Sequence, residues 1–120
     1  MTSIDYCLDK ARAIPYIKGQ TRHYAVVVNK RGRVVGEGRN EYLKTHPLAA
    51  KAGKAVGLPA KECVHAELSA LLSDRHRKGV KLVVCRVDSR GRSAYSEPCQ
   101  VCKYVIKEYF PNIKSVEYSI

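Results

Sequence analysis

Two short motifs in this sequence combine the residue types that bind metal ions. The first is HAE at residues 65–67, and the second is PCQVC at residues 98–102. Cysteines three residues apart project from the same side of a helix, so the thiols of Cys99 and Cys102 can reach one ion. If a helix opens at Pro98, its dipole also favours the thiolate form that binds zinc. The spacing therefore predicts a zinc site with two thiolate ligands.

His65 is the candidate for a third ligand, supplied by a neighbouring helix. Three protein ligands leave a fourth position for water, which is the pattern of catalytic zinc sites. Glu67 follows two residues later, about 200° around an ideal helix, and is therefore poorly placed to bind the same ion. We expect it on the water side of the site, where a carboxylate can take a proton from water and deliver it to a leaving group.

Two other interpretations of the cysteines have to be compared with this one. A lone CxxC can be a redox pair or half of a structural zinc site. The redox interpretation leaves the HAE motif unexplained, and a second CxxC for a structural site does not occur in the sequence. Cys63 is an alternative fourth ligand, which would close the water position. Cys7, Cys63 and Cys85 lie in otherwise apolar surroundings, and the favoured prediction for all three is a small core residue.

Composition and charge indicate the surroundings of this site. The 120 residues are 45% hydrophobic and 28% charged, which is typical of one globular domain spanning residues 1–120. A net charge of +11 favours anionic partners such as nucleotides or nucleic acid, with a solvated basic surface as the alternative. The sequence has no apolar run of roughly 20 residues and no secretory signal, so we expect a cytoplasmic protein and no membrane partner.

The elements that must position the motifs follow from hydrophobic periodicity. Helical spacing, β-branched runs and turn residues predict an alternation of helices and strands. Helices are expected over residues 4–17, 48–56, 64–74 and 98–109, and strands over 23–29, 34–39, 80–87 and 113–118. This order predicts an α/β fold in which a mixed sheet is covered by helices on both faces. His23 and His76, which lie beside arginines, are expected at the surface.

The paired motifs resemble the signature of the cytidine/deoxycytidylate deaminase superfamily, H-x-E followed by P-C-x-x-C. The segments GEGRNEYLKTHPLAAKAG at 36–53 and IKSVEYS at 113–119 also resemble small phage-type members. The resemblance implies a three-layer α-β-α sandwich with a mixed four-stranded sheet. It also implies Zn²⁺ on His65, Cys99 and Cys102, with Glu67 as the catalytic proton carrier.

The same resemblance implies how a substrate is held. Asn40 would bond the sugar, and the backbone of Ala66 would meet the base carbonyl. The backbone around Ser96 or Glu97 would accept a hydrogen bond from the amino group. His46 is either a contact to a phosphate or base, or a helix cap.

The implied reaction is zinc-dependent hydrolytic deamination of cytosine to uracil. Its partner would be a cytosine nucleotide of the dCMP or CMP type, or single-stranded nucleic acid. The alternatives are deamination of adenosine in RNA and a catalytically inactive zinc module that binds nucleic acid. Assembly into a homo-oligomer is left open.

Overall fold

The protein is built around one mixed β-sheet. The computed structural model describes residues 2–57 and 63–120, with the backbone alone for 42–45 and 63–64. The strands of the sheet are β1 (Arg22–Val28), β2 (Val34–Arg39), β5 (Lys81–Val87), β6 (Ser93–Ala94) and β7 (Ser115–Tyr118). Their order is β2-β1-β5, with β6 and β7 both paired to β5. Only the β5–β7 pair is parallel among these strands, so the sheet is mixed as predicted.

The predicted number of four strands in this sheet was wrong, because β6 adds a fifth. β6 is two residues long and pairs Ala94 with Arg86 and Ser93 with Val87. A strand this short cannot produce an alternating pattern in the sequence, so periodicity gives no signal for it. The fold class and the three layers are confirmed.

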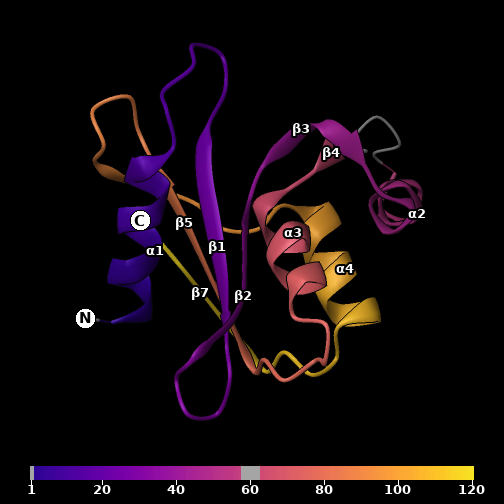
Figure 1. Cartoon of the computed structure of the whole chain (residues 1–120). Coiled ribbons are helices and arrows are strands. Elements are labelled where there is room, and N and C mark those ends of the chain that lie inside the picture. The colour runs from indigo at the N-terminus through magenta and orange to yellow at the C-terminus, as the bar shows by residue number, and fades with distance from the viewer. Residues whose placement is uncertain (1, 58–62) are drawn as a thin grey trace.

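Helices cover both faces of the sheet (Figure 1). Helix α1 (Ser3–Ala13) lies on one face, while α3 (Ala66–Ser73) and α4 (Gln100–Tyr109) lie on the other. Helix α2 (Pro47–Ala55) packs against α4 on the outside. None of the described helices is long and apolar enough to cross a bilayer.

Helix α1 ends four residues earlier than predicted. Its first residues form a capping box between Thr2 and Asp5, and its last hydrogen bond runs from the Ile14 N–H to the Ala11 carbonyl. Pro15 follows at once, and a proline disfavours helical geometry at the residue before it. Residues 14–21 therefore form a linker that carries the chain across to β1, where the apolar pattern had predicted another helical turn.

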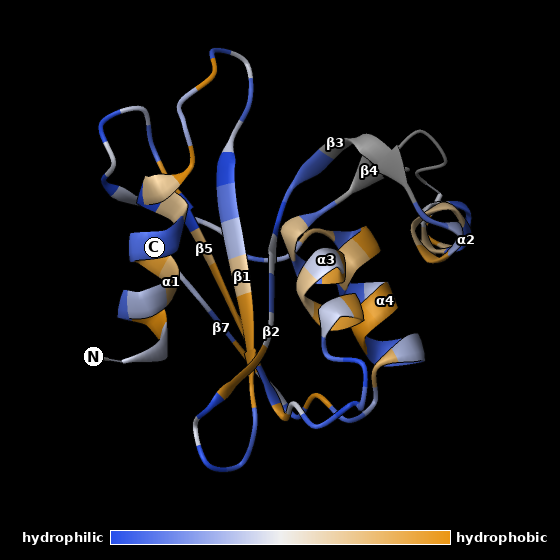
Figure 2. Cartoon of the chain, viewed as in Figure 1, coloured by the Kyte–Doolittle hydropathy of each residue, from blue (hydrophilic) through white to orange (hydrophobic). Residues whose placement is uncertain are grey.

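The apolar core lies on both sides of the sheet because residues alternate along β1 and β5. On the α1 side, Val26 and Val83 pack with the fully buried Cys7 and Cys85, which confirms these two cysteines as core residues. On the other side, Ala25, Val27 and Val84 pack with apolar residues of α3 and α4. Figure 2 shows the apolar residues along the middle of the sheet and on these two helices.

A second, two-stranded sheet leads into α3. It pairs β3 (Glu41–Thr45) with β4 (Cys63–Val64) in antiparallel fashion. The sequence pattern predicted no strand over the residues of β3 or β4, so it missed both elements. Because β3 directly follows β2 and β4 directly precedes His65, this sheet brings the end of β2 next to the start of α3.

Candidate zinc centre and substrate pocket

The three predicted metal ligands come together at the starts of two helices. His65 is the N-cap residue of α3, Cys99 is the N-cap residue of α4, and Cys102 lies in the first turn of α4. The His65 Nδ1 atom is 3.2 Å from the Cys102 sulfur and 3.6 Å from the Cys99 sulfur. All three ligand atoms lie within 4.8 Å of one another.

These distances fit a tetrahedral zinc ion. With Zn–S bonds of about 2.3 Å and Zn–N bonds of about 2.05 Å, the nitrogen and a sulfur at neighbouring corners are about 3.5 Å apart. The two measured separations, 3.2 and 3.6 Å, bracket that value. Two sulfurs and one nitrogen are also the donors that zinc prefers. The chemistry and the geometry of the set therefore fit Zn²⁺, bound through Nδ1 of the histidine.

The two thiols differ in acidity. A hydrogen bond from the Cys102 thiol lowers the pKa of Cys99 to about 3, although partial burial opposes this fall. The hydrogen bond to Cys99, together with burial, raises the pKa of Cys102 well above its ordinary value. The metal-free pair therefore loses its first proton easily and holds the second. Binding of zinc displaces this remaining proton, so zinc affinity depends on pH.

Glu67 is buried beside the three ligands, with 5% of its surface exposed. Burial raises the pKa of its carboxyl group above the ordinary value, and the nearby His65 and Cys102 side chains counter this rise in part. A carboxyl group with a raised pKa exchanges protons more readily near neutral pH than an exposed one. The position fits the role that the sequence predicted, which stays a prediction.

A cavity of about 280 Å³ opens directly onto these residues. Its walls come from the start of β1, the end of β2, and the starts of α3 and α4. The lining residues are Thr21, His23, Asn40, His65, Glu67, Glu97 and Cys99. The pocket therefore contains two zinc ligands, the buried carboxylate, and several hydrogen-bonding side chains that converge on them.

Asn40 lines this pocket and also holds the start of α3 in place. Its Oδ1 atom accepts a hydrogen bond of 2.8 Å from the Ala66 N–H. His65, the N-cap residue, provides no side-chain cap to this helix, so Asn40 satisfies one of its free N–H groups. The predicted contacts of Asn40 with the sugar and of Ala66 with the base carbonyl stay predictions. In the structure these two groups bond each other.

His23 was expected at the surface, and that interpretation was wrong. Its ring is half-buried and lines the pocket, because odd-numbered residues of β1 face α3 and α4. His76 is exposed as expected. Burial, followed by the charges of Arg86 and His65, lowers the pKa of His23 to about 4. The imidazole is therefore neutral at neutral pH.

The hydrogen-bond partners of His23 favour a proton on Nε2, because Thr21 Oγ1 and the Asn40 amide nitrogen both lie near Nδ1. Since Asn40 Oδ1 accepts from Ala66, the Asn40 amide nitrogen faces Thr21, whose Oγ1 atom is 3.4 Å away. The Thr21 hydroxyl lies 2.8 Å from His23 Nδ1 and can donate its hydrogen there. This direction assigns the proton of His23 to Nε2. A histidine that lies beside an arginine at the start of a strand gives no signal of burial, which is why the sequence did not reveal it.

The remaining residues predicted to contact the substrate are Ser96, Glu97 and His46, and of these only Glu97 lines the pocket. Ser96 is buried, and its hydroxyl donates to the Val84 carbonyl at 2.9 Å and bonds Ser119, so its side chain anchors the loop before α4. The Glu97 carboxylate lines the pocket while it bonds Tyr95 and forms an ion pair of 2.9 Å with Lys103. His46 caps α2 by accepting from the Leu48 N–H at 3.1 Å, and it is not among the residues that line the pocket.

Comparisons with known proteins agree with this geometry. A family model that describes the cytidine and deoxycytidylate deaminase zinc-binding region matches residues 3–119. The fold is similar to the crystal structure of a mutant cytidine deaminase from Mycobacterium tuberculosis, with a TM-score of 0.50 and 18% sequence identity. That match covers 95% of this chain and 81% of the other. No curated protein matches the sequence significantly. The chain belongs to the cytidine and deoxycytidylate deaminase family.

Proposed function

We propose that this protein hydrolyses the exocyclic amine of cytosine, in a nucleotide or a polynucleotide, to give uracil and ammonia. One observation carries the proposal: a buried carboxylate, Glu67, lines a pocket of about 280 Å³ together with His65 and Cys99, two of the three candidate zinc ligands. A zinc module that only binds nucleic acid has no need of a carboxylate whose burial costs free energy. A hydrolytic enzyme does need one, because protons must move from the attacking water to the leaving amine.

The residues of the pocket divide the work of this reaction. His65, Cys99 and Cys102 would hold Zn²⁺, which when bound supplies Lewis-acid activation of the attacking water. Glu67 accepts a proton from that water on its carboxylate and delivers it to the nitrogen that leaves as ammonia. The net change consumes one water, breaks the ring-carbon to amine bond, and forms the carbonyl of uracil.

The other pocket residues hold and orient the base. His23 offers an N–H donor at Nε2 to an acceptor on the base, such as the cytosine carbonyl. Asn40 keeps the first turn of α3 against β2, which fixes Glu67 and His65 relative to that donor. The neutral state of His23 keeps a second cation out of the zinc site, since its pKa of about 4 lies well below neutral pH.

A substrate screen tests the proposal. Zinc-loaded protein is incubated with dCMP, CMP, cytidine, single-stranded oligonucleotides that contain cytosine, and an adenosine-containing RNA. Products that contain uracil or inosine are measured by mass spectrometry. Glu67→Gln, loaded with the same amount of zinc, serves as the matched control. We expect uracil from at least one substrate with the wild type and none with the variant. Binding of oligonucleotides without turnover would instead support the inactive module, and inosine from an adenosine-containing RNA would support the adenosine deaminase.

A further inference from the structure

A second and larger cavity lies next to the zinc-site pocket. Its volume is about 420 Å³, against about 280 Å³ for the pocket that contains Glu67. Three residues, Thr21, His23 and Asn40, line both cavities, so the two lie side by side across a common wall. The other walls are the linker after α1 and the junction of β2 with β3. A molecule that places its reactive group at the zinc site can therefore extend into this cavity.

The linker gives the second cavity an apolar wall. Ile14, Pro15 and Ile17 line it, and Ile17 is 53% exposed. An exposed isoleucine at a cavity that adjoins a catalytic pocket is a surface on which a flat ring can pack. The sugar and phosphate of a free nucleotide would leave this apolar wall uncovered, whereas a second nucleobase would cover it.

A buried arginine, Arg22, holds the linker that forms this apolar wall in position. Arg22 has 9% of its surface exposed, and its guanidinium donates to the carbonyls of Ile14 and Asp88. These acceptors are uncharged carbonyls, so no carboxylate neutralises the positive charge of Arg22 through these bonds. The bond to Ile14 fixes the start of the linker, which preorganises the apolar wall.

The opposite side of the cavity carries a cation that is available for an anionic group. Arg39, the last residue of β2, lines the cavity and is exposed. Its backbone belongs to the β1–β2 ladder, whereas its guanidinium forms no hydrogen bond or ion pair with the described side chains and backbone of residues 2–57 and 63–120. A guanidinium of this kind matches the oxygens of a phosphate. Glu41 is the carboxylate that lines the same cavity, so the two arginines leave its lining with a net positive charge.

We propose that this cavity holds the base of a nucleotide next to the target cytosine, and that Arg39 binds the phosphate between them. The inference rests on the proposed deaminase function and assigns single-stranded nucleic acid as its substrate class. The neighbouring base packs against Ile14, Pro15 and Ile17 while the target base occupies the pocket of Glu67. The net charge of +11 supplies the long-range attraction that a polyanion needs.

A substrate series tests the added site. We compare kcat/KM for dCMP, for dinucleotides with a neighbour on the 5′ or the 3′ side of cytosine, and for a single-stranded 12-mer. Burial of about 40 Å² of apolar surface under one base is worth about 1 kcal/mol, which corresponds to roughly five-fold in affinity. We therefore expect a rise of about that size from dCMP to one of the two dinucleotides. Equal kcat/KM for dCMP and all longer substrates would overturn the proposal.

Two variants assign the gain to the cavity. Ile17→Ser should reduce kcat/KM for the better dinucleotide and the 12-mer by roughly five-fold, because apolar contact with the neighbouring base is lost, and leave dCMP unchanged. Arg39→Ala should reduce the slope of log affinity against log salt by about 0.7 for the 12-mer, because one phosphate contact is lost. Both side chains are exposed, so thermal melting should confirm that both variants fold.

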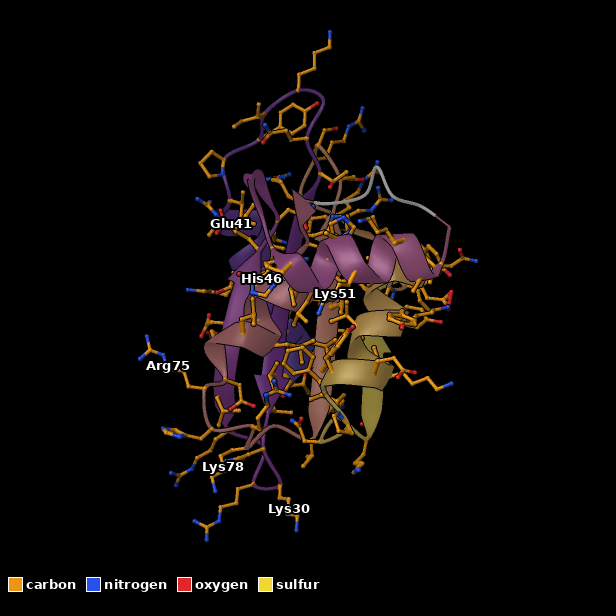
Figure 3. All side chains as sticks on the ribbon, turned by 90° about the vertical axis from the view of Figure 1, so that its right-hand side faces the viewer. Lys30, Glu41, His46, Lys51, Arg75 and Lys78 are labelled. Carbon is orange, nitrogen blue, oxygen red and sulfur yellow. The ribbon has the colours of Figure 1, made fainter. Side chains whose placement is uncertain are left out.

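Two control variants remove side chains of the same types from exposed positions outside the cavity. Ile120→Ser removes another exposed isoleucine, and Arg31→Ala removes another exposed arginine, from the β1–β2 turn at the far end of the sheet. Other cations, Lys30, Arg75 and Lys78, also lie toward that end, away from Glu41 (Figure 3). An Arg31→Ala variant that loses as much salt dependence as Arg39→Ala would assign the binding to general surface charge and overturn the site.

Failure of this inference is distinguishable from failure of the proposed function. If the wild type deaminates dCMP and the oligonucleotides equally, and neither variant changes this, the enzyme stands and the added site is wrong. If no substrate is deaminated, fluorescence anisotropy of the bound 12-mer tests whether the cavity binds nucleic acid at all. Weaker binding by Ile17→Ser and Arg39→Ala, but not by their controls, keeps the cavity assignment without the reaction. Equal binding by all variants overturns both.

Discussion

Glu67 is a carboxylate in the protein interior beside three groups that bind a cation. Its burial raises the pKa, so at neutral pH the folded metal-free protein bears a free-energy cost for the charged form. The unfolded chain releases this proton more easily than the folded protein does. The free energy of unfolding therefore falls as the pH rises past the ordinary carboxyl pKa. The burial of Glu67 thus lowers the stability of the metal-free protein at neutral pH.

Replacement of Glu67 by glutamine separates these two effects. The amide has nearly the same shape but cannot accept and deliver a proton. We expect Glu67→Gln to keep the zinc content of the wild type and to reduce kcat by at least about 100-fold. Its thermal midpoint in the metal-free form should equal or exceed that of the wild type at pH 7. Zinc content is measured by elemental analysis, and a variant with unchanged kcat would contradict the role of Glu67.

Asn40 has two candidate roles, and two substitutions distinguish them. Asn40→Ala removes the acceptor of the Ala66 N–H and should cost about 1 kcal/mol in the free energy of unfolding. Asn40→Asp keeps an oxygen acceptor at a helix N-terminus and should retain that stability. It loses the N–H donor to Thr21, so the effect on activity should persist. Urea unfolding gives the first quantity, and KM and kcat give the second.

Equal stability of Asn40→Ala and the wild type would show that the bond to Ala66 does not hold α3. A raised KM in Asn40→Asp, with kcat unchanged, would favour the predicted bond to the sugar, since that interaction is made equally in the ground and transition states. A lower kcat would instead favour the hydrogen-bond chain that sets the proton position of His23.

At the scale of elements, two glycines in β2 allow α3 to lie directly on the sheet. A Cβ atom at Gly36 would stand 2.5 Å from the Ala70 carbonyl oxygen, and one at Gly38 would stand 2.9 Å from the Ala70 nitrogen. These neighbours belong to the helix backbone, so they cannot rotate away as a side chain would. The close contact places the start of α3, with His65 and Glu67, against the end of β2.

We expect Gly36→Ala to push α3 away from the sheet. Overpacking of this kind costs about 1–3 kcal/mol, and it should also reduce zinc affinity because His65 moves relative to Cys99. Val34→Ala, at a position on the same strand that is 38% exposed, serves as the control and should cost less. Urea unfolding and zinc titration are the measurements. A Gly36→Ala variant with wild-type stability would show that the helix does not need this contact.

The sequence predicted elements with strong local signals and missed those that tertiary contacts create. Both motifs open helices as expected, because the cysteine spacing is itself helical. Strands β3, β4 and β6 were missed. β3 and β4 exist only through their pairing with each other, and β6 is two residues long, too short to show an alternating pattern. His23 was placed on the surface because it lies beside Arg22, yet β1 turns these neighbours to opposite faces of the sheet. Whether His23 is buried depends on the helices that cover its face of the sheet. The residues of β1 alone do not determine where those helices lie.

At the scale of the whole molecule, the zinc site connects two helices that the apolar core already holds. α3 and α4 contribute Leu68, Leu71, Val101 and Val105 to the same buried cluster. The sheet and its α1 face form a second cluster with no part in the metal site. The fold therefore has apolar stabilisation on both faces, in contrast to small zinc modules whose chains unfold without the ion.

This arrangement predicts that removal of zinc weakens the protein without unfolding it. A chelator should lower the free energy of unfolding by the contribution of metal binding, about 2.7 kcal/mol where free zinc is 100-fold above its Kd, and the thermal midpoint should fall accordingly. Far-UV circular dichroism at 25 °C should keep its helix and strand content. Cys99→Ala should show the low midpoint with or without added zinc, because one of three ligands is lost. A chelated wild type that loses its secondary structure at 25 °C would mean that the metal, and not the two apolar clusters, holds the layers together.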